Sequence, residues 1–158
     1  MPKGKGHDKS TKEGKDFFKK IKQLAKLEVC IGFQRGSNTN DDGVDMVDIA
    51  VWNELGTAKM PARPFLRHTA DNNKTNIEKL AVLKFKEILN GKTEEEALND
   101  IGIIIKALVQ DTITHSKDWA IENKQSTIKR KKSDTPLIDT GQMLQAVNYF
   151  IKEKGDKT

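Results

Sequence analysis

The sequence predicts an α+β domain in which a small, mostly antiparallel sheet packs against a long antiparallel helical hairpin. Two observations lead to this fold class. A long helical pattern from Phe65 to about Asn90 is followed, after Gly91, by a second one that continues to about Ser116. Segments rich in β-branched and aromatic residues lie far apart, at Leu27–Phe33 and Gln145–Lys152.

The N-terminal part of the chain changes character at Asp16. Residues 1–15 are rich in Gly and Lys and have no large apolar residue after Met1, which predicts a disordered basic segment. From Asp16 the apolar residues Phe17, Phe18, Ile21 and Leu24 have the spacing of an amphipathic helix. Leu27–Phe33 is then expected to form a buried strand, with Cys30 as a small buried hydrophobe.

The next segments are a loop, a helix and an extended crossing. Gln34–Gly43 is rich in Gly, Ser, Asn and Asp and is expected to be an exposed loop. The periodicity of Val44–Leu55 suits either a helix or a strand, and we favour a helix that ends at Gly56 because glycine readily takes the left-handed conformation there. Met60–Pro64 carries two prolines, which predict an extended segment.

The helical hairpin is predicted from its apolar faces and its turn. A capping box is predicted at Thr93-Glu94-Glu95-Glu96. In this motif the side chains of Thr93 and Glu96 each satisfy a backbone N–H at the start of the second helix. The expected apolar face of the first helix comprises Leu66, Ile77, Leu80, Val82, Leu83, Phe85, Ile88 and Leu89. That of the second comprises Ala97, Leu98, Ile101, Ile104, Ile105, Leu108, Val109, Thr112 and Ile113.

The C-terminal part contains an arm and a strand. Lys117–Thr135 is polar and basic, which predicts an exposed arm or loop anchored by Trp119. The alternation of apolar and polar residues predicts a strand over Gln145–Lys152. The expected organisation is therefore a basic flexible segment at 1–15, one α+β domain at 16–152 and a charged tail at 153–158.

Composition limits the classes of function. The chain has 158 residues, 28 basic and 23 acidic, for a net charge of +5, which is compatible with nucleic-acid contact. Basic residues concentrate at 1–26 and 124–132, whereas Asp41, Asp42, Asp45 and Asp48 form an acidic patch, and segregated opposite charges equally suit self-association. One cysteine excludes an intramolecular disulfide, and no apolar run is long enough for a membrane span, so we expect a soluble protein made in the cytosol.

The sequence carries no catalytic, cofactor or metal motif. The three histidines, His7, His68 and His115, are far apart and have no partner ligands at metal-binding spacing. No glycine-rich phosphate loop or dinucleotide fingerprint is present. We therefore expect a protein that is not an enzyme and has no cofactor.

A basic run remains to be explained. The run has no aromatic residue between its basic residues, which argues against binding of single-stranded nucleic acid. Its basic residues are Lys124, Lys129, Arg130, Lys131 and Lys132. The run is either a solvated loop or a surface that contacts an acidic face of a neighbouring subunit or nearby DNA phosphates.

Two stretches dense in Gly, Pro and Arg carry a family resemblance. The first is IAVWNELGT at 49–57, followed by MPARPFLR at 60–67, and the second is QSTIKRK at 125–131 with PLIDTGQMLQAV at 136–147. In this order and spacing the chain resembles a family of small tailed-bacteriophage and prophage virion proteins. These are the neck, head–tail joining or tail-completion proteins, also called virion morphogenesis proteins or minor tail components. The resemblance covers about residues 27–152.

The resemblance implies a structural subunit that joins the capsid's portal or connector complex to the tail, as a ring of identical copies around the DNA channel. A hexamer or dodecamer is expected, in contact with head-closure proteins and with tail-terminator or tail-tube proteins, in the virion after assembly from the host cytoplasm. The implied subunit interface comprises Glu54, Gly56, Thr57, Pro61, Arg63, Pro64, Phe65, Arg67, Pro136, Asp139, Thr140 and Gly141. The alternatives are a tail terminator that caps the tail tube and a basic nucleic-acid-binding accessory protein.

These interface residues also have purely structural explanations. In the first explanation, Phe65 starts the core face of the long helix, and Arg63 pairs with Glu54 of the same subunit. In the second explanation, Asp139-Thr140-Gly141 is only a cap and turn. Thr140 could equally cap a short helical turn through Met143–Leu144.

Overall fold

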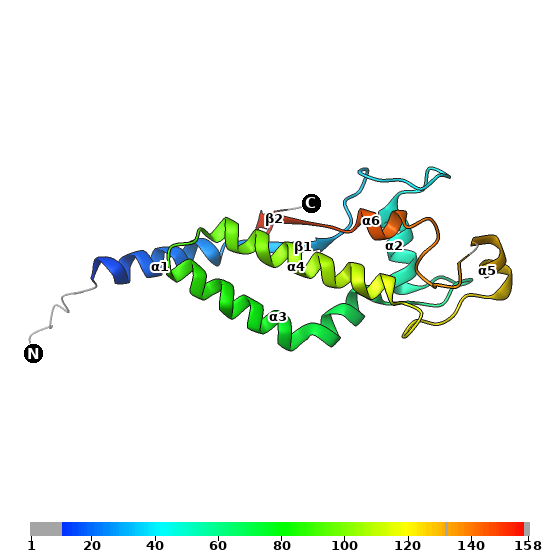
Figure 1. Cartoon of the computed structure of the whole chain (residues 1–158). Helices are drawn as coiled ribbons and strands as arrows, with labels where there is room; N and C mark the ends of the chain where they lie inside the picture. The colour runs from blue at the N-terminus through cyan, green and yellow to red at the C-terminus, as the bar shows by residue number, and fades with distance from the viewer. Residues whose placement is uncertain (1–10, 132, 157–158) are drawn as a thin grey trace, which may run out of the picture.

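An antiparallel helical hairpin forms the middle of the elongated molecule, and a two-stranded sheet lies along it (Figure 1). The structure is a computed structural model and describes residues 11–131 and 133–156. The elements are α1 (Lys12–Leu24), β1 (Leu27–Gly32), α2 (Met46–Leu55), α3 (Phe65–Leu89), α4 (Glu94–Thr114), α5 (Gln125–Lys131), α6 (Gln142–Ala146) and β2 (Asn148–Glu153). The predicted α+β class, with its hairpin and its small antiparallel sheet, is confirmed.

The N-terminal helix begins earlier than predicted. Lys12 is already helical because the Thr11 side chain caps the helix by accepting a hydrogen bond from the backbone N–H of Gly14, at 3.2 Å. The acidic side chain of Glu13 adds a favourable charge in the first turn. The predicted helix start at Asp16, and the disorder predicted for residues 12–15, were therefore wrong. The rest of the segment predicted to be disordered, residues 1–10, lies outside the described residues.

The two strands pair in an antiparallel register that places Val29 opposite Ile151 and Ile31 opposite Tyr149. The ring of Tyr149 lies over Gly102 of α4, where an added Cβ would approach Tyr149 Cδ2 to 2.2 Å. The absence of a side chain at Gly102 thus lets the sheet approach the hairpin closely. Both predicted strands are confirmed, but the first is half-buried, Cys30 included, because α4 covers only one face of the sheet. Residues 145–147 are not in the strand, since α6 ends at Ala146.

The hairpin turn is built as predicted, but part of the predicted apolar face was wrong. Both hydrogen bonds of the Thr93 capping box are present. The apolar residues of α3 that are buried or half-buried include Ile77, Leu80 and Ile88, at helical spacing. Exposed instead are Val82, Leu83, Leu89 and Ile104.

The loop after α2 and the segment after α4 also acquire defined structure. Gly56 ends α2 with a φ of 76°, as predicted, and donates its N–H to Trp52. The expected arm Lys117–Thr135 contains the short helix α5, which was missed. Trp119 anchors the arm, since its ring stacks on His68 with centroids 4.1 Å apart and its Nε1 donates to the Thr112 carbonyl at 3.0 Å.

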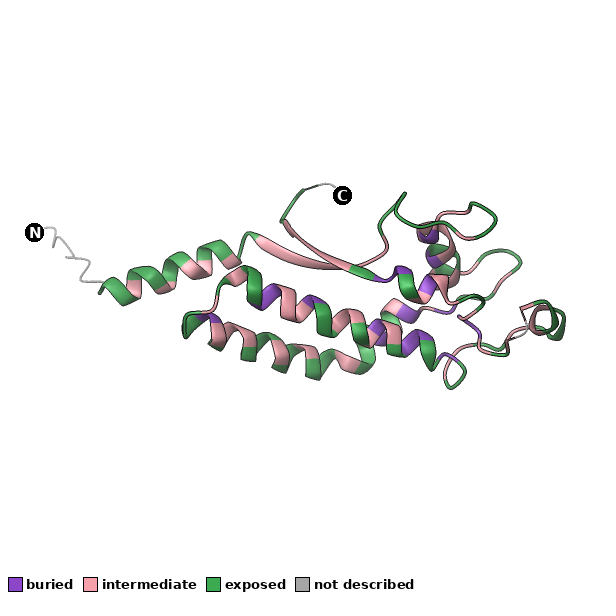
Figure 2. Ribbon diagram, turned by 45° about the horizontal axis from the view of Figure 1, so that its top comes forward, coloured by how far each residue is buried: buried purple, intermediate pink, exposed green. Residues whose placement is uncertain are grey.

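The core lies at one end of the molecule. We call this the cavity end; it comprises α2, α5, α6, the first turn of α3 and the last turns of α4 (Figure 2). Its buried members are Met46, Ala50, Phe65, Val109, Ile113, Leu137, Met143, Ala146 and Val147. The opposite end, with α1 and the α3–α4 turn, is called the turn end. Among the helices of the described chain, none combines the length and the apolar character that a bilayer crossing requires.

Candidate functional site

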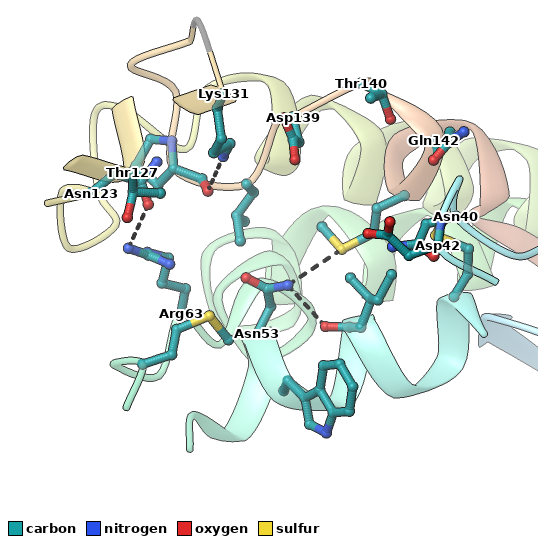
Figure 3. Close-up of a pocket in the computed structure, with 18 of the residues that line it drawn as sticks. Asn40, Asp42, Asn53, Arg63, Asn123, Thr127, Lys131, Asp139, Thr140 and Gln142 are labelled. Atoms are coloured by element: carbon teal, nitrogen blue, oxygen red, sulfur yellow. Dashed lines mark hydrogen bonds between the residues drawn. The ribbon is translucent and has the colours of Figure 1, made fainter. Parts of the chain in front are cut away.

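The two family-like stretches, far apart in the sequence, line one cavity of about 320 Å³ at the cavity end (Figure 3). Asn53, Met60 and Arg63 come from the first stretch, and Pro136, Leu137 and residues 139–143 come from the second. The basic helix α5 contributes Thr127, Arg130 and Lys131. The structure therefore brings the two stretches together around a cavity that the sequence analysis did not predict.

The loop between α2 and α3 is held in one conformation by close backbone packing. An added Cβ at Gly56 would lie 2.7 Å from the backbone nitrogen of Ala62, and Gly56 also has a positive φ. The Glu54 carboxylate accepts hydrogen bonds from the N–H groups of Leu66 (2.9 Å) and Arg67 (3.2 Å) at the start of α3. Glu54 therefore caps a helix that has no side-chain cap at Pro64.

Phe65 and Arg63 point into the protomer instead of outward. Phe65 is 0% exposed and contacts Phe33 in an edge-to-face arrangement with ring centroids 6.0 Å apart. Arg63 is 4% exposed. Of the two explanations left open for Phe65, the structure favours the core position. Phe65 has no exposed surface with which to contact another subunit, and Arg63 can be reached only through the cavity that it lines.

Arg63 does not pair with Glu54. Its Nε donates to the Ile121 carbonyl at 2.7 Å, and its Nη2 donates to Asn123 Oδ1 at 3.0 Å. A weaker bond joins Nη2 to the Glu122 carbonyl at 3.3 Å. Burial lowers the pKa of the Arg63 guanidinium. Arg63 thus ties the crossing segment to the arm after α4, across 58 residues of sequence.

The second stretch divides into buried and exposed residues. Pro136 and Leu137 are buried, whereas Asp139 and Thr140 are exposed at the cavity. Gly141, with a φ of 83°, precedes α6 as its N-cap residue, and no side chain caps that helix. The short helical turn is present as one of the alternatives proposed, but Thr140 is not its cap.

The basic run does not act as one surface. Lys124 is exposed just before α5, Lys129 and Arg130 are exposed on α5, and Lys132 lies outside the described residues. Lys131 turns toward the chain and donates to the carbonyls of Pro136 (3.2 Å) and Thr135 (3.4 Å). Burial lowers its pKa as well.

The predicted acidic patch is also partly used within the protomer. Asp45 caps α2 by accepting from Val47 N–H at 2.8 Å, and Asp48 forms a bidentate pair with Arg35. Hydrogen bonds lower the pKa of both carboxyl groups below its usual range. Only Asp41 and Asp42 line the cavity, where Gln142 donates to Asp41 at 2.8 Å.

Sequence reasoning missed two features of this region. Asn123 lines the cavity and contacts Arg63, but an isolated Asn in a polar arm gives no recognisable pattern. Val51, Trp52 and Leu55 form an exposed apolar surface on α2, and Leu55 is 68% exposed. This second apolar face explains the ambiguous periodicity of α2, because a helix that is apolar on both sides shows little amphipathic pattern.

Comparisons with protein families, curated proteins and solved structures found no match to this chain. In the parts of the chain described by the structure, no three His, Cys, Asp or Glu side chains are grouped so that they could hold a metal ion. The site is therefore characterised by its geometry alone: a cavity with polar and charged lining beside an exposed apolar helix face.

Proposed function

We propose that the protein is a structural subunit of the neck of a tailed bacteriophage, which joins the capsid portal complex to the tail as a ring of identical copies. The family resemblance of residues 49–67 and 125–147 motivates this proposal. It is supported by one observation in particular, the exposed apolar surface of Val51, Trp52 and Leu55 beside the cavity. Apolar patches of this kind commonly mark sites of protein–protein contact.

The roles of the predicted interface residues differ under this proposal. Gly56, Arg63 and Phe65 hold the loop and the core in place, as their packing indicates. Direct contacts with neighbours are assigned to the α2 surface and to the exposed residues at the cavity mouth, among them Asp139 and Thr140. Phe65, which is completely buried, acts by positioning these contacts.

The experiment is complementation of a phage that lacks this gene product. Leu55→Glu places a charge in the centre of the apolar surface but leaves the core untouched, so the purified variant should fold with an unchanged melting temperature. Cells that supply it should accumulate separate heads and tails in electron micrographs. Asn76→Glu is the matched control, since it adds the same charge at an exposed position on α3, and should restore joined particles.

Two results would contradict the proposal. If heads and tails join normally with Leu55→Glu, the apolar surface of α2 has no role in assembly. If virions that wholly lack the protein are infectious, the protein is not a required subunit of the neck. Cryo-electron microscopy of joined particles then separates the neck position from the tail-terminator position.

A second candidate function is favoured by the surface of α1. Its lysines, including Lys12, Lys15 and Lys19, are on an exposed helix at the turn end, which suits contact with nucleic-acid phosphates. A DNA-binding accessory protein should lose duplex affinity by orders of magnitude between about 50 and 200 mM salt. A ring subunit should bind duplex DNA weakly throughout this range, and fluorescence anisotropy distinguishes the two.

A further inference from the structure

The deep part of the cavity holds a buried cation without an anionic partner. Arg63 is 4% exposed, and its hydrogen-bond acceptors are two backbone carbonyls and the amide oxygen of Asn123, all uncharged. Within residues 11–131 and 133–156, no carboxylate forms a salt bridge with it. Buried charges are normally paired, because desolvating an unpaired ion costs several kcal/mol.

Lys131 presents a second positive charge to the same cavity. Its Nζ is bonded to the carbonyls of Thr135 and Pro136, which are also neutral acceptors. Burial lowers its pKa, and the nearby charges of Arg63 and Arg130 act in the same direction, while Asp139 opposes them. The two partly buried cations therefore repel one another across the cavity.

The amide group of Asn123 completes the set of donors. Its Oδ1 accepts from Arg63, which fixes the orientation of the amide, since a flipped amide would turn its own donors toward the guanidinium. Its Nδ2 is then buried and has no hydrogen-bond partner in the described chain. A buried donor without an acceptor costs about 1–3 kcal/mol.

We propose that this cavity is a receptor for a single carboxylate, supplied by an acidic side chain of a neighbouring protein and held by Arg63, Asn123 and Lys131. One negatively charged group with several lone pairs would satisfy the orphan amide donor and neutralise the unpaired charge together. Figure 3 shows Arg63, Asn123 and Lys131 around the same side of the cavity. The proposal rests on the proposed function only for the identity of the neighbour, a protein of the neck.

The rim and walls of the cavity favour a protein carboxylate over nucleic acid. The cavity lining balances the carboxylates of Asp41, Asp42 and Asp139 against the cations Arg63, Arg130 and Lys131, so it offers no net positive charge to a polyanion, whereas a lone carboxylate needs only the cations nearest to it. Arg63 is too deeply buried for a phosphodiester backbone to reach. Apolar walls can receive the aliphatic part of an acidic side chain, and they are formed by Met46, Ile49, Trp52, Met60, Leu137 and Met143.

The first test supplies the carboxylate within the chain. Asn123→Asp replaces the amide oxygen that lies 3.0 Å from Arg63 Nη2 with a charged oxygen and removes the orphan donor. We expect urea unfolding to show an unfolding equilibrium constant about tenfold smaller than that of the wild type, because hydrogen bonds to charged groups are the stronger kind. Asn76→Asp on exposed α3 adds the same charge and should change the constant by less than about twofold.

The second test measures binding directly on the intact ¹⁵N-labelled protein. Sodium acetate, with sodium chloride replaced to keep ionic strength constant, should give saturable shifts of the Arg63 Nε–Hε and Asn123 side-chain signals. Asn123→Asp should abolish these shifts, because its own carboxylate occupies the position. Inorganic phosphate should bind more weakly than acetate.

The outcomes separate this inference from the proposed function. A variant Asn123→Asp no more stable than the wild type, an absence of saturable acetate shifts, or tighter binding of phosphate would each overturn the carboxylate receptor. None of these measurements uses virus particles. If acetate binds as expected in a protein that proves absent from the neck, the receptor stands and the proposed function fails.

Discussion

The two ends of this molecule are held together by different forces. At the cavity end, Phe65, Ile113 and Val147 are completely buried, and Arg63 is buried among hydrogen-bond acceptors. At the turn end, the buried apolar residues are fewer (Ile88, Ala97 and Leu98), α1 has no buried residue, and a network of partly exposed ion pairs joins Lys84 and Lys92 to acidic partners. Apolar packing fixes geometry at the first end, whereas screened charges and a partly covered helix leave the second end softer.

The largest expected effect comes from comparing two phenylalanines. Phe65→Ala empties a site at 0% exposure in the core and should lower the free energy of unfolding by about 3–5 kcal/mol. Phe18→Ala at the turn end removes a side chain that is 59% exposed and should change it by no more than about 0.5 kcal/mol. Urea unfolding followed by circular dichroism measures both. Equal costs would show that α1 belongs to the core.

A second pair of substitutions compares a crowded glycine with one in open space. Gly56 and Gly43 have nearly the same φ, 76° and 78°, but Gly56 also has a ψ of 175°, which essentially only glycine adopts, and only Gly56 has neighbours within 4 Å of an added Cβ. Gly43→Ala should therefore cost about 1 kcal/mol for the left-handed conformation alone. Gly56→Ala should cost about 3 kcal/mol, because the Ala62 backbone at 2.7 Å has to move as well.

The unfolding midpoints in urea give both values. Similar costs at the two positions would mean that the loop between α2 and α3 adjusts freely, which would contradict the rigid cavity end described above. A larger cost at Gly56 accompanied by an altered acetate response would link this loop to the shape of the cavity.

The same contrast explains what the sequence could predict. Helix ends are determined by residues within one turn of each other, so the Thr93 capping box and the Gly56 terminus were found from the pattern alone. The partners of Arg63 are 58 to 60 residues away, and two of them are backbone carbonyls, which any residue provides. No local pattern contains that information.

Apolar periodicity located the helices but did not decide which of their apolar side chains pack. It predicted the hairpin, but it also assigned Val82 and Leu83 to the packed face, although they are exposed. The missed helix α5 has no buried residue, so it carries no apolar stripe to detect. The cavity itself was not predictable, because its walls come from segments whose arrangement depends on tertiary packing.

The smallest expected effect tests the turn end through pH. Hydrogen bonds from Lys84 and Lys92 lower the pKa of the Asp100 carboxyl below its usual range, and Lys92 and Lys84 do the same for Glu87. A carboxyl whose folded pKa is lowered contributes stability above its unfolded pKa of about 4 and loses that contribution as pH falls through the folded value. Asp100→Asn should therefore reduce stability at pH 7 and make no difference at a pH low enough to protonate the wild-type carboxyl.

Urea midpoints of wild type and Asp100→Asn between pH 7 and pH 2.5 measure this difference, and the comparison cancels the contributions of other shifted carboxyls such as Asp48. The difference should also shrink when sodium chloride is raised to 1 M, since exposed ion pairs are screened. The cost of Phe65→Ala should be insensitive to the same salt change apart from a uniform rise in stability. If the Asp100→Asn difference persists at high salt, the ion pairs at the turn end are shielded from solvent, and the two ends are more alike than their burial indicates.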